Sequence, residues 1–252
     1  MSEKFNPREL EFDVKHCEPE EMCLECATSA LSYSPAGIAL RSMEPRFGTW
    51  MWEDRERMKQ FLPDTDPLMH GPNQAQTVAL PMIEFQNAFG YRRFSRAEAK
   101  LLYLTHVFHD AHEGVWAQRL GMSHDIAKPQ KTRENDILEL ALNREIVSNI
   151  LRVEPDHPLI EGMQNVMGDF DGQTFLGRAF TAIEYAGYCE NGLRAWALRN
   201  HNDLDHQERE MCEQMGRVVV TADVPKLEKY AVEFPYIAMY LDRIRVAERQ
   251  MR

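Results

Sequence analysis

The chain has 252 residues, of which 44% are hydrophobic and 27% are charged, and its formal net charge is −11. This composition is typical of a globular protein and excludes an intrinsically disordered chain. The acidic charge argues against an extended nucleic-acid surface, because such a surface needs clustered Lys and Arg. A small phosphorylated ligand needs only two or three local cations and stays compatible with this charge.

The sequence also predicts the compartment. No stretch is long or apolar enough to cross a membrane, and segment 1–13 lacks the apolar run of a signal peptide. The five cysteines are odd in number and unevenly placed, which favours a reducing environment over a disulfide framework. We therefore expect a cytoplasmic protein with no membrane partner.

Apolar residues at helical spacing dominate the chain. In chain order, helices are expected over residues 18–31, 51–61, 73–89, 95–114, 132–153, 173–198 and 225–251. The fourth begins with a Ser-x-x-Glu capping box at Ser95, and Thr132 can cap the fifth. Pro and Gly break the pattern over 34–48, Pro155 and Pro158 break it again, and a further break is expected near Pro235. Val218–Val220 has strand character but is too short for a sheet, so the prediction is an all-α bundle.

The segment 106–113 concentrates chemistry, with three histidines and two carboxylates in eight residues. On a helix, His106 and His109 are three residues apart and His109 and Glu113 are four apart, so they would share a face. Asp110 lies one turn after His106. Imidazole and carboxylate together suit Zn, Mn, Fe or Co. A polar helix end with hydrogen-bonded histidines is the alternative, and the density of ligand types favours a metal site.

Two motifs in this region resemble a known superfamily. The sequence HDAHE at 109–113 is followed by DIAKPQK at 125–131, and His70 lies upstream at the start of an expected helix. This pattern resembles the HD superfamily of metal-dependent phosphohydrolases and is similar to the bacterial 5'-deoxynucleotidases and their relatives. The resemblance covers roughly residues 63–198. It implies an HD-type helical core there, with helical extensions over 1–62 and 199–252, the latter packed on the core.

The resemblance also implies roles for individual residues. His70, His109 and Asp110 would be metal ligands. Glu113 would be the acid or base that orients the attacking water, and Asp125 would match an acidic residue near the reacting phosphate.

Three cations are candidates for binding the substrate phosphate. Lys128 and Lys131 belong to the second motif, and Arg93 precedes the expected helix that carries the first. Arg suits bidentate contacts to phosphate. Each of the three can equally be a solvated loop residue.

The sequence departs from the family pattern at two places. His124 stands where Gly is usual, in a loop that is longer than the family's. The family's last metal ligand is an Asp in a stretch similar to AFTAIEY at 179–185, where this chain has Thr181. Glu184 lies three residues further on and could reach the metal instead. Asp169 and Asp171 are further substitutes, and loss of tight metal binding is the remaining alternative.

The resemblance implies a metal-dependent hydrolase for the phosphate ester of a nucleotide or similar small molecule. Its cofactor would be a divalent metal ion, which could be Mn, Co, Zn, Fe or Mg. Two alternatives stay open: an HD scaffold that binds a nucleotide or regulates without turnover, and a di-metal HD-fold oxygenase that uses the extra histidines. By the same resemblance the chain could pair as a homodimer, with 225–251 as a candidate interface.

A second group of metal-ligand types lies near the N-terminus. Cys23 and Cys26 have the Cys-x-x-Cys spacing and could bind structural zinc with His16 or Cys17. Both cysteines fall within an expected helix, and no second Cys-x-x-Cys follows. Buried thiols are therefore the favoured interpretation.

Overall fold

The computed structural model describes residues 19, 21–43, 61–62, 66–115 and 132–251. These segments contain helices and no strand, which confirms the all-α prediction. The expected helix over 51–61 lies almost entirely outside the described residues. None of the helices within the described ranges has the length and apolarity that a membrane span requires.

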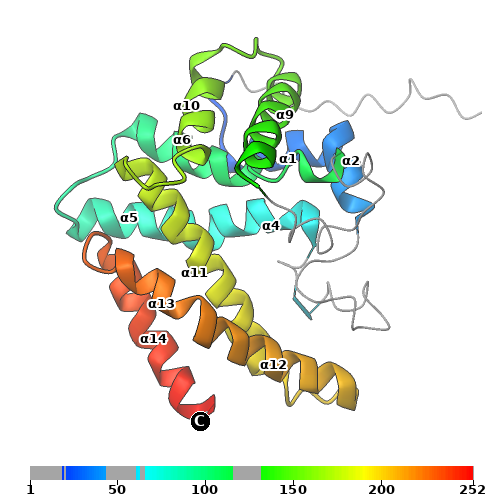
Figure 1. The fold of residues 1–252 in the computed structure, drawn as a ribbon, viewed down its shortest axis with the longest axis vertical. Helices are drawn as coiled ribbons and strands as arrows, with labels where there is room; N and C mark the ends of the chain where they lie inside the picture. The colour runs from blue at the N-terminus through cyan, green and yellow to red at the C-terminus, as the bar shows by residue number, and fades with distance from the viewer. Residues whose placement is uncertain (1–18, 20, 44–60, 63–65, 116–131, 252) are drawn as a thin grey trace, which may run out of the picture.

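The helix expected over 73–89 is longer than predicted. It begins as α4 (Pro67–Gln74), continues through the π-helical turn η4 (Ala75–Ala79) and ends as α5 (Leu80–Phe89). Asp66 caps its start, where its carboxylate accepts a hydrogen bond from the Leu68 amide. Pro81, two residues after the π turn, lacks an N–H and so cannot donate the hydrogen bond of a regular α-helix to residue 77. Figure 1 shows the three pieces as one long rod.

Two helices pack against this rod and position the candidate site. They are α6 (Arg96–Phe108), which begins with the predicted capping box at Ser95, and α11 (Phe175–Leu198). Side chains on all sides of α11 are buried, and many of them are Ala or Gly. A helix that is apolar all round belongs in a protein core. Figure 1 shows α11 running through the middle of the molecule.

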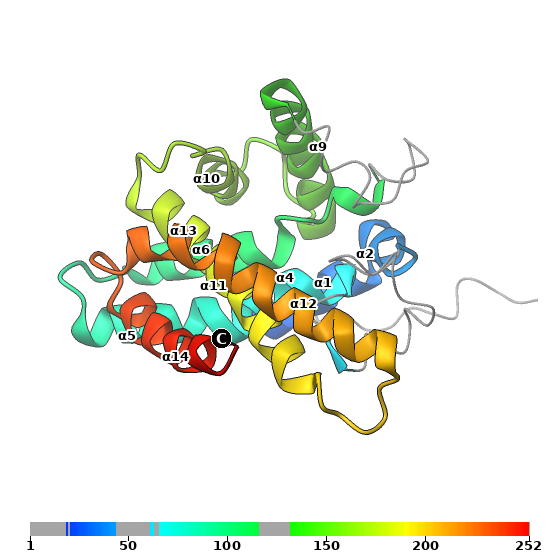
Figure 2. The ribbon, with the colours of Figure 1, turned by 60° about the horizontal axis from the view of Figure 1, so that its bottom comes forward.

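The C-terminal helices cover α11 and α5. They are α12 (His206–Ala222), α13 (Val224–Leu227), the 3-10 turn η6 (Glu228–Tyr230) and α14 (Pro235–Met251). Helix α12 packs along α11, and α14 packs against α5 (Figure 2). Val219, Leu227 and Ile237 share one hydrophobic cluster with residues of α5, α6 and α11. The C-terminal extension and the central helices therefore share a core.

A second hydrophobic cluster joins the N-terminal helices to the middle of the chain. It packs α1 (Leu24–Tyr33) and α2 (Pro35–Arg41) against α4, α6, α9 (Arg133–Leu151) and α10 (Pro158–Met167). Thr132 caps α9 as predicted, because its hydroxyl accepts from the Asn135 amide.

Three helices lie where the sequence predicted a break or a loop. Proline begins two of them: Pro35 follows the Ser34 cap of α2, and Pro158 follows the His157 cap of α10. Proline fits the first helical turn, whose N–H groups have no intrahelical acceptor. Helix α12 includes the strand-like Val218–Val220 run, and its polar start is a capping box at Asp205.

Candidate metal centre

The helix that carries the first motif ends earlier than predicted. Helix α6 stops at Phe108, residues 109–112 form turns, and a new helical turn begins at Glu113. The prediction that His109 and Glu113 share one helical face is therefore wrong. The buried amide of Asn143, on α9, donates to the carbonyl oxygens of Phe108 at 2.8 Å and His109 at 3.1 Å. It thus caps the end of α6 together with the Ala111 amide, which also donates to the Phe108 carbonyl at 3.0 Å.

The 109–112 turn brings His109 and Asp110 against His70 of α4. The Oδ2 atom of Asp110 lies 3.0 Å from His109 Nε2 and 3.9 Å from His70 Nε2. One ligand atom from each of the three residues falls within 4.8 Å of the other two. This triad joins helix α4 to the turn after α6, and its members are the three metal ligands that the resemblance implies.

A second triad adds α11 to the same place. The Oε1 atom of Glu184 lies 3.3 Å from His106 Nδ1 and 3.3 Å from His109 Nε2. These three ligand atoms also fall within 4.8 Å of one another. His109 belongs to both triads. We call the five residues His70, His106, His109, Asp110 and Glu184 the histidine–carboxylate cluster.

A glycine next to His70 explains how α4 comes so close to α6. A Cβ atom on Gly71 would lie 2.3 Å from the carbonyl oxygen of His106 and 2.9 Å from that of Val107. Any larger residue would push the backbones of the two helices apart. The His70–Gly71 pair therefore supplies both a ligand and the close contact that delivers it.

Hydrogen bonds orient the ligands of the cluster. His109 Nδ1 lies 2.7 Å from the carbonyl oxygen of His106, so this nitrogen is the donor and Nε2 faces the carboxylates. Metal-binding histidines almost always donate their second ring nitrogen in this way. Tyr188, one turn after Glu184 on α11, donates to Glu184 Oε2 at 3.2 Å, and its ring stacks against His70.

The cluster shifts the pKa values of its members in opposite directions. Burial disfavours a charged imidazole at His109, but the carboxylates of Asp110 and Glu184 outweigh it and raise the pKa of His109 to about 9. Burial likewise opposes the Glu184 carboxylate, yet His109 and His106 lower its pKa to about 2. At His106 burial dominates and lowers the pKa. The cluster therefore keeps Glu184 ionised beside imidazole nitrogens, which is a donor set that transition metals bind.

The other predicted site residues do not join the cluster in the described structure. Glu113 is buried but belongs to neither triad. Arg93 is exposed and precedes α6, whereas His109 follows it, so about 20 Å of helix separates them. Asp125, Lys128 and Lys131 lie outside the described residues, as does His124.

The structure distinguishes the residues that were candidates for the last metal ligand, on α11 and in the loop before it. Asp169 holds the loop before α11, where its carboxylate accepts from the Gln173 and Thr174 amides and from the hydroxyl of Thr174, the N-cap of α11. Thr181 donates to the Gly177 carbonyl, and its hydroxyl also hydrogen-bonds Tyr230, which partly offsets the rise that burial causes in the Tyr230 pKa. Neither residue belongs to the triads. Glu184 is the α11 carboxylate that does.

Sequence reasoning missed two residues that support the cluster, Tyr188 and Asn143. The Glu184-x-x-x-Tyr188 spacing is a signal for the first, because residues four apart meet on a helix face. Asn143 carries no such signal, since its partners are 34 and 35 residues away. It also lies 3.4 Å from His112 Nδ1 and accepts from Gln164 at 3.2 Å. His112 Nε2 lies 3.6 Å from Glu139, and we call these four residues the asparagine network.

The N-terminal cysteines are not the buried thiols that were expected, because Cys23 is exposed at the start of α1 and Cys26 is half-buried. Cys23 caps α1, where its sulfur accepts from the Cys26 amide at 3.4 Å. No group of three metal-ligand types that includes a cysteine is found in the described part of the chain. His16 and Cys17 lie outside it, so the zinc hypothesis stays untested.

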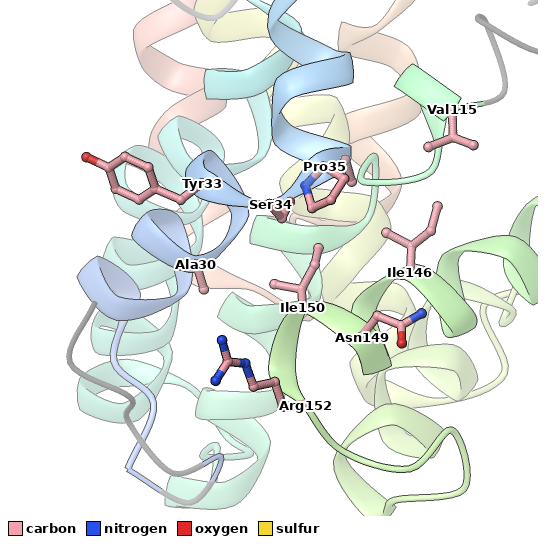
Figure 3. A pocket seen from close by; sticks show the side chains of 10 residues that line it. Ala30, Tyr33, Ser34, Pro35, Val115, Ile146, Asn149, Ile150 and Arg152 are labelled. Atoms are coloured by element: carbon pink, nitrogen blue, oxygen red, sulfur yellow. The ribbon is translucent and has the colours of Figure 1, made fainter. Parts of the chain in front are cut away.

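A cavity of about 580 Å³ lies apart from the cluster. Figure 3 shows it between the α1–α2 junction, at Tyr33 and Pro35, and the end of α9, at Ile146 and Ile150. Its lining contains none of the cluster residues and few polar side chains. It does not extend the candidate metal centre.

The chain was compared with protein-family models, with curated proteins and with solved structures, and none of them matches it.

Proposed function

We propose that the protein is a metal-dependent phosphohydrolase that acts on the phosphate ester of a nucleotide or a similar small molecule. The observation that carries this proposal is that imidazole and carboxylate groups from α4, from α6 and the turn after it, and from α11 form two triads that share His109. The HDAHE and DIAKPQK motifs, which resemble those of the HD superfamily, support the choice of phosphate chemistry over other metal chemistry.

His70, His109, Asp110 and Glu184 would hold the metal. Their donor set fits a divalent transition ion better than Mg²⁺, which prefers oxygen ligands and keeps several waters. Such an ion supplies Lewis acidity to the phosphoryl group and the attacking water.

The protein's own residues would position the ligands and move the proton. Tyr188 and the His106 carbonyl hold Glu184 and His109 in place through the hydrogen bonds at 3.2 and 2.7 Å. Glu113, three residues after Asp110, would accept the proton of the water and return it to the leaving oxygen. Lys128 and Lys131 would neutralise phosphate charge. Arg93 lies at the far end of α6, so we do not assign it to this task.

The test measures phosphate release from a panel of nucleoside mono-, di- and triphosphates, with Mn²⁺, Co²⁺, Zn²⁺, Fe²⁺ or Mg²⁺ added in turn. We expect release with at least one transition ion, loss of release in Asp110→Ala, and a large loss in Glu113→Gln that leaves metal binding intact. Asp203→Ala removes an exposed carboxylate in the turn after α11 and is the matched control.

The outcomes separate the parts of the proposal. No release with any ion would overturn the hydrolase, and unchanged release in Asp110→Ala would overturn the assigned centre. Tight metal binding without release would favour a scaffold that binds without turnover.

A further inference from the structure

His106 is a fully buried residue that the proposed ligand set does not use. It lies on α6 one turn before His109, and its ring stacks on Phe180 with the centroids 4.5 Å apart. Neither of its ring nitrogens makes a hydrogen bond within the described structure. Leaving a buried polar group without a hydrogen bond is costly, so native proteins rarely do it.

The nearest charged atom to this ring has ligand-like geometry. Glu184 Oε1 lies 3.3 Å from His106 Nδ1 and 3.3 Å from His109 Nε2, and it makes no hydrogen bond with either. Metal–ligand bonds of about 2.1 Å place neighbouring ligands about 3.0–3.4 Å apart in octahedral or tetrahedral geometry. Each nitrogen thus lies at the spacing of an adjacent ligand from Glu184 Oε1, and the ligand atoms of the three residues fall within 4.8 Å of one another.

The hydrogen bonding of His109 indicates whether the two triads bind one metal ion or two. Its Nδ1 donates to the His106 carbonyl, so only the lone pair on Nε2 faces the cluster. That lone pair cannot bind two ions at once, although His109 belongs to both triads. The two triads are therefore better described as overlapping parts of a single coordination shell.

We propose that His106 is a further protein ligand of the same ion and binds it through Nδ1. The shell then holds three imidazoles, from His70, His106 and His109, and two carboxylates, from Asp110 and Glu184. Such a nitrogen-rich set selects Fe²⁺, Co²⁺, Mn²⁺ or Zn²⁺ over Mg²⁺. This inference rests on the metal centre of the proposed function and does not depend on turnover.

The competing role for His106 is to orient Glu184 without touching the ion. Counting the coordinated histidines separates the two roles. In protein loaded with Co²⁺, each coordinated imidazole contributes one exchangeable N–H proton with a hyperfine-shifted NMR signal. We expect three such signals in the wild type and two in His106→Gln. We also expect His106→Gln to weaken Co²⁺ binding by at least about tenfold, the lower limit seen when even a supporting group is lost.

His112→Gln is the matched control, because His112 is also buried in the same segment but belongs to the asparagine network. It should keep three signals. Two signals in the wild type would overturn the inference, and this count stands even where His106→Gln fails to fold. Three signals without phosphate release would support His106 as a ligand and overturn the proposed hydrolase function. Two signals with phosphate release would overturn His106 as a ligand and support the hydrolase function.

Discussion

Two polar clusters meet at the 109–112 turn, and they differ in how they are held. In the asparagine network, Asn143 donates to two carbonyls and accepts from Gln164, with distances of 2.8–3.2 Å. In the histidine–carboxylate cluster, charged groups approach to 3.0–3.9 Å, and Glu184 Oε1 makes no hydrogen bond to the imidazoles beside it.

The difference shows what each cluster does. The Asn143 amide, whose nitrogen donates to two carbonyls and whose oxygen accepts from Gln164, stabilises one arrangement of the backbone. In the histidine–carboxylate cluster, the ring nitrogens of His106 and the Oε1 atom of Glu184 are buried without a hydrogen bond, which costs stability unless something else binds them. The asparagine network thus fixes the turn, and the turn presents ligands that suit a cation. Breaking each cluster separately should have different effects on folding and on metal binding.

The largest effect is expected from Glu184→Gln. It removes one carboxylate that faces two imidazoles, so affinity for Co²⁺ or Zn²⁺ should fall by more than about 100-fold. The free energy of unfolding of the metal-free protein should fall by about 3 kcal/mol, because His109 loses a buried counter-charge. Calorimetric titration and urea unfolding measure the two quantities. Glu190→Gln, six residues later on α11 and bonded to Tyr240, is the control and should leave affinity unchanged.

The second prediction concerns pH. Since the pKa of His109 is raised to about 9, its imidazole carries a proton at pH 7 in the metal-free protein. The metal must displace that proton, so affinity should rise by about tenfold per pH unit up to about pH 9. Titrations at pH 7 in buffers of different ionisation enthalpy should show about one proton released per ion. Release of no proton would contradict the assignment of His109 as a ligand.

The same shifts set the stability of the metal-free protein. The raised pKa of His109 stabilises the fold fully below its ordinary value of 6.5, and this contribution is lost as pH rises through about 9. The lowered pKa of Glu184 stabilises the fold above its ordinary value of 4.5, and this contribution is lost as pH falls towards about 2. Urea unfolding should therefore show the cluster's largest contribution between pH 4.5 and 6.5.

Asn143→Leu should have a smaller effect on the metal and a clear effect on folding. It leaves the carbonyls of Phe108 and His109 without their buried donor, which costs about 2 kcal/mol of unfolding free energy. Metal affinity should fall by about tenfold, because the turn loses its support while the ligands stay. Asn149→Leu, an exposed position on the same helix, is the control. A greater loss of affinity than in Glu184→Gln would contradict the division between the two clusters.

Local sequence signals predicted the helical class and several helix starts. The capping box at Ser95 and the Thr132 cap act through residues two or three positions away, so the sequence displays them. Helices α2 and α10 were missed because proline was interpreted as a break, although it occupies the first turn of each. The early end of α6 was missed because it depends on Asn143, a residue of another helix.

In the candidate site, too, some residues could be predicted from the sequence and others depend on how the helices pack. The HDAHE motif places His109 and Asp110 side by side in the sequence, and the resemblance supplied His70. The prediction that His109 and Glu113 share a helical face was wrong. It assumed a helix over 95–114, whereas α6 ends at Phe108. Which α11 residue reaches the cluster depends on how that helix is rotated about its axis when it packs, and a single sequence does not show this rotation.

Substitutions of Thr181 have the smallest expected effect, and they test how α11 is rotated about its axis. The resemblance aligns Thr181 with the family's Asp ligand, whereas in this fold its hydroxyl bonds Gly177 and Tyr230. Thr181→Val should change the unfolding free energy by about 1 kcal/mol or less and leave metal affinity unchanged. Thr181→Asp should not increase affinity, since its carboxylate would begin on the face that meets Tyr230. A marked gain of affinity in Thr181→Asp, measured by the same calorimetric titration, would show that Thr181 faces the ion and that Glu184 is not the α11 ligand.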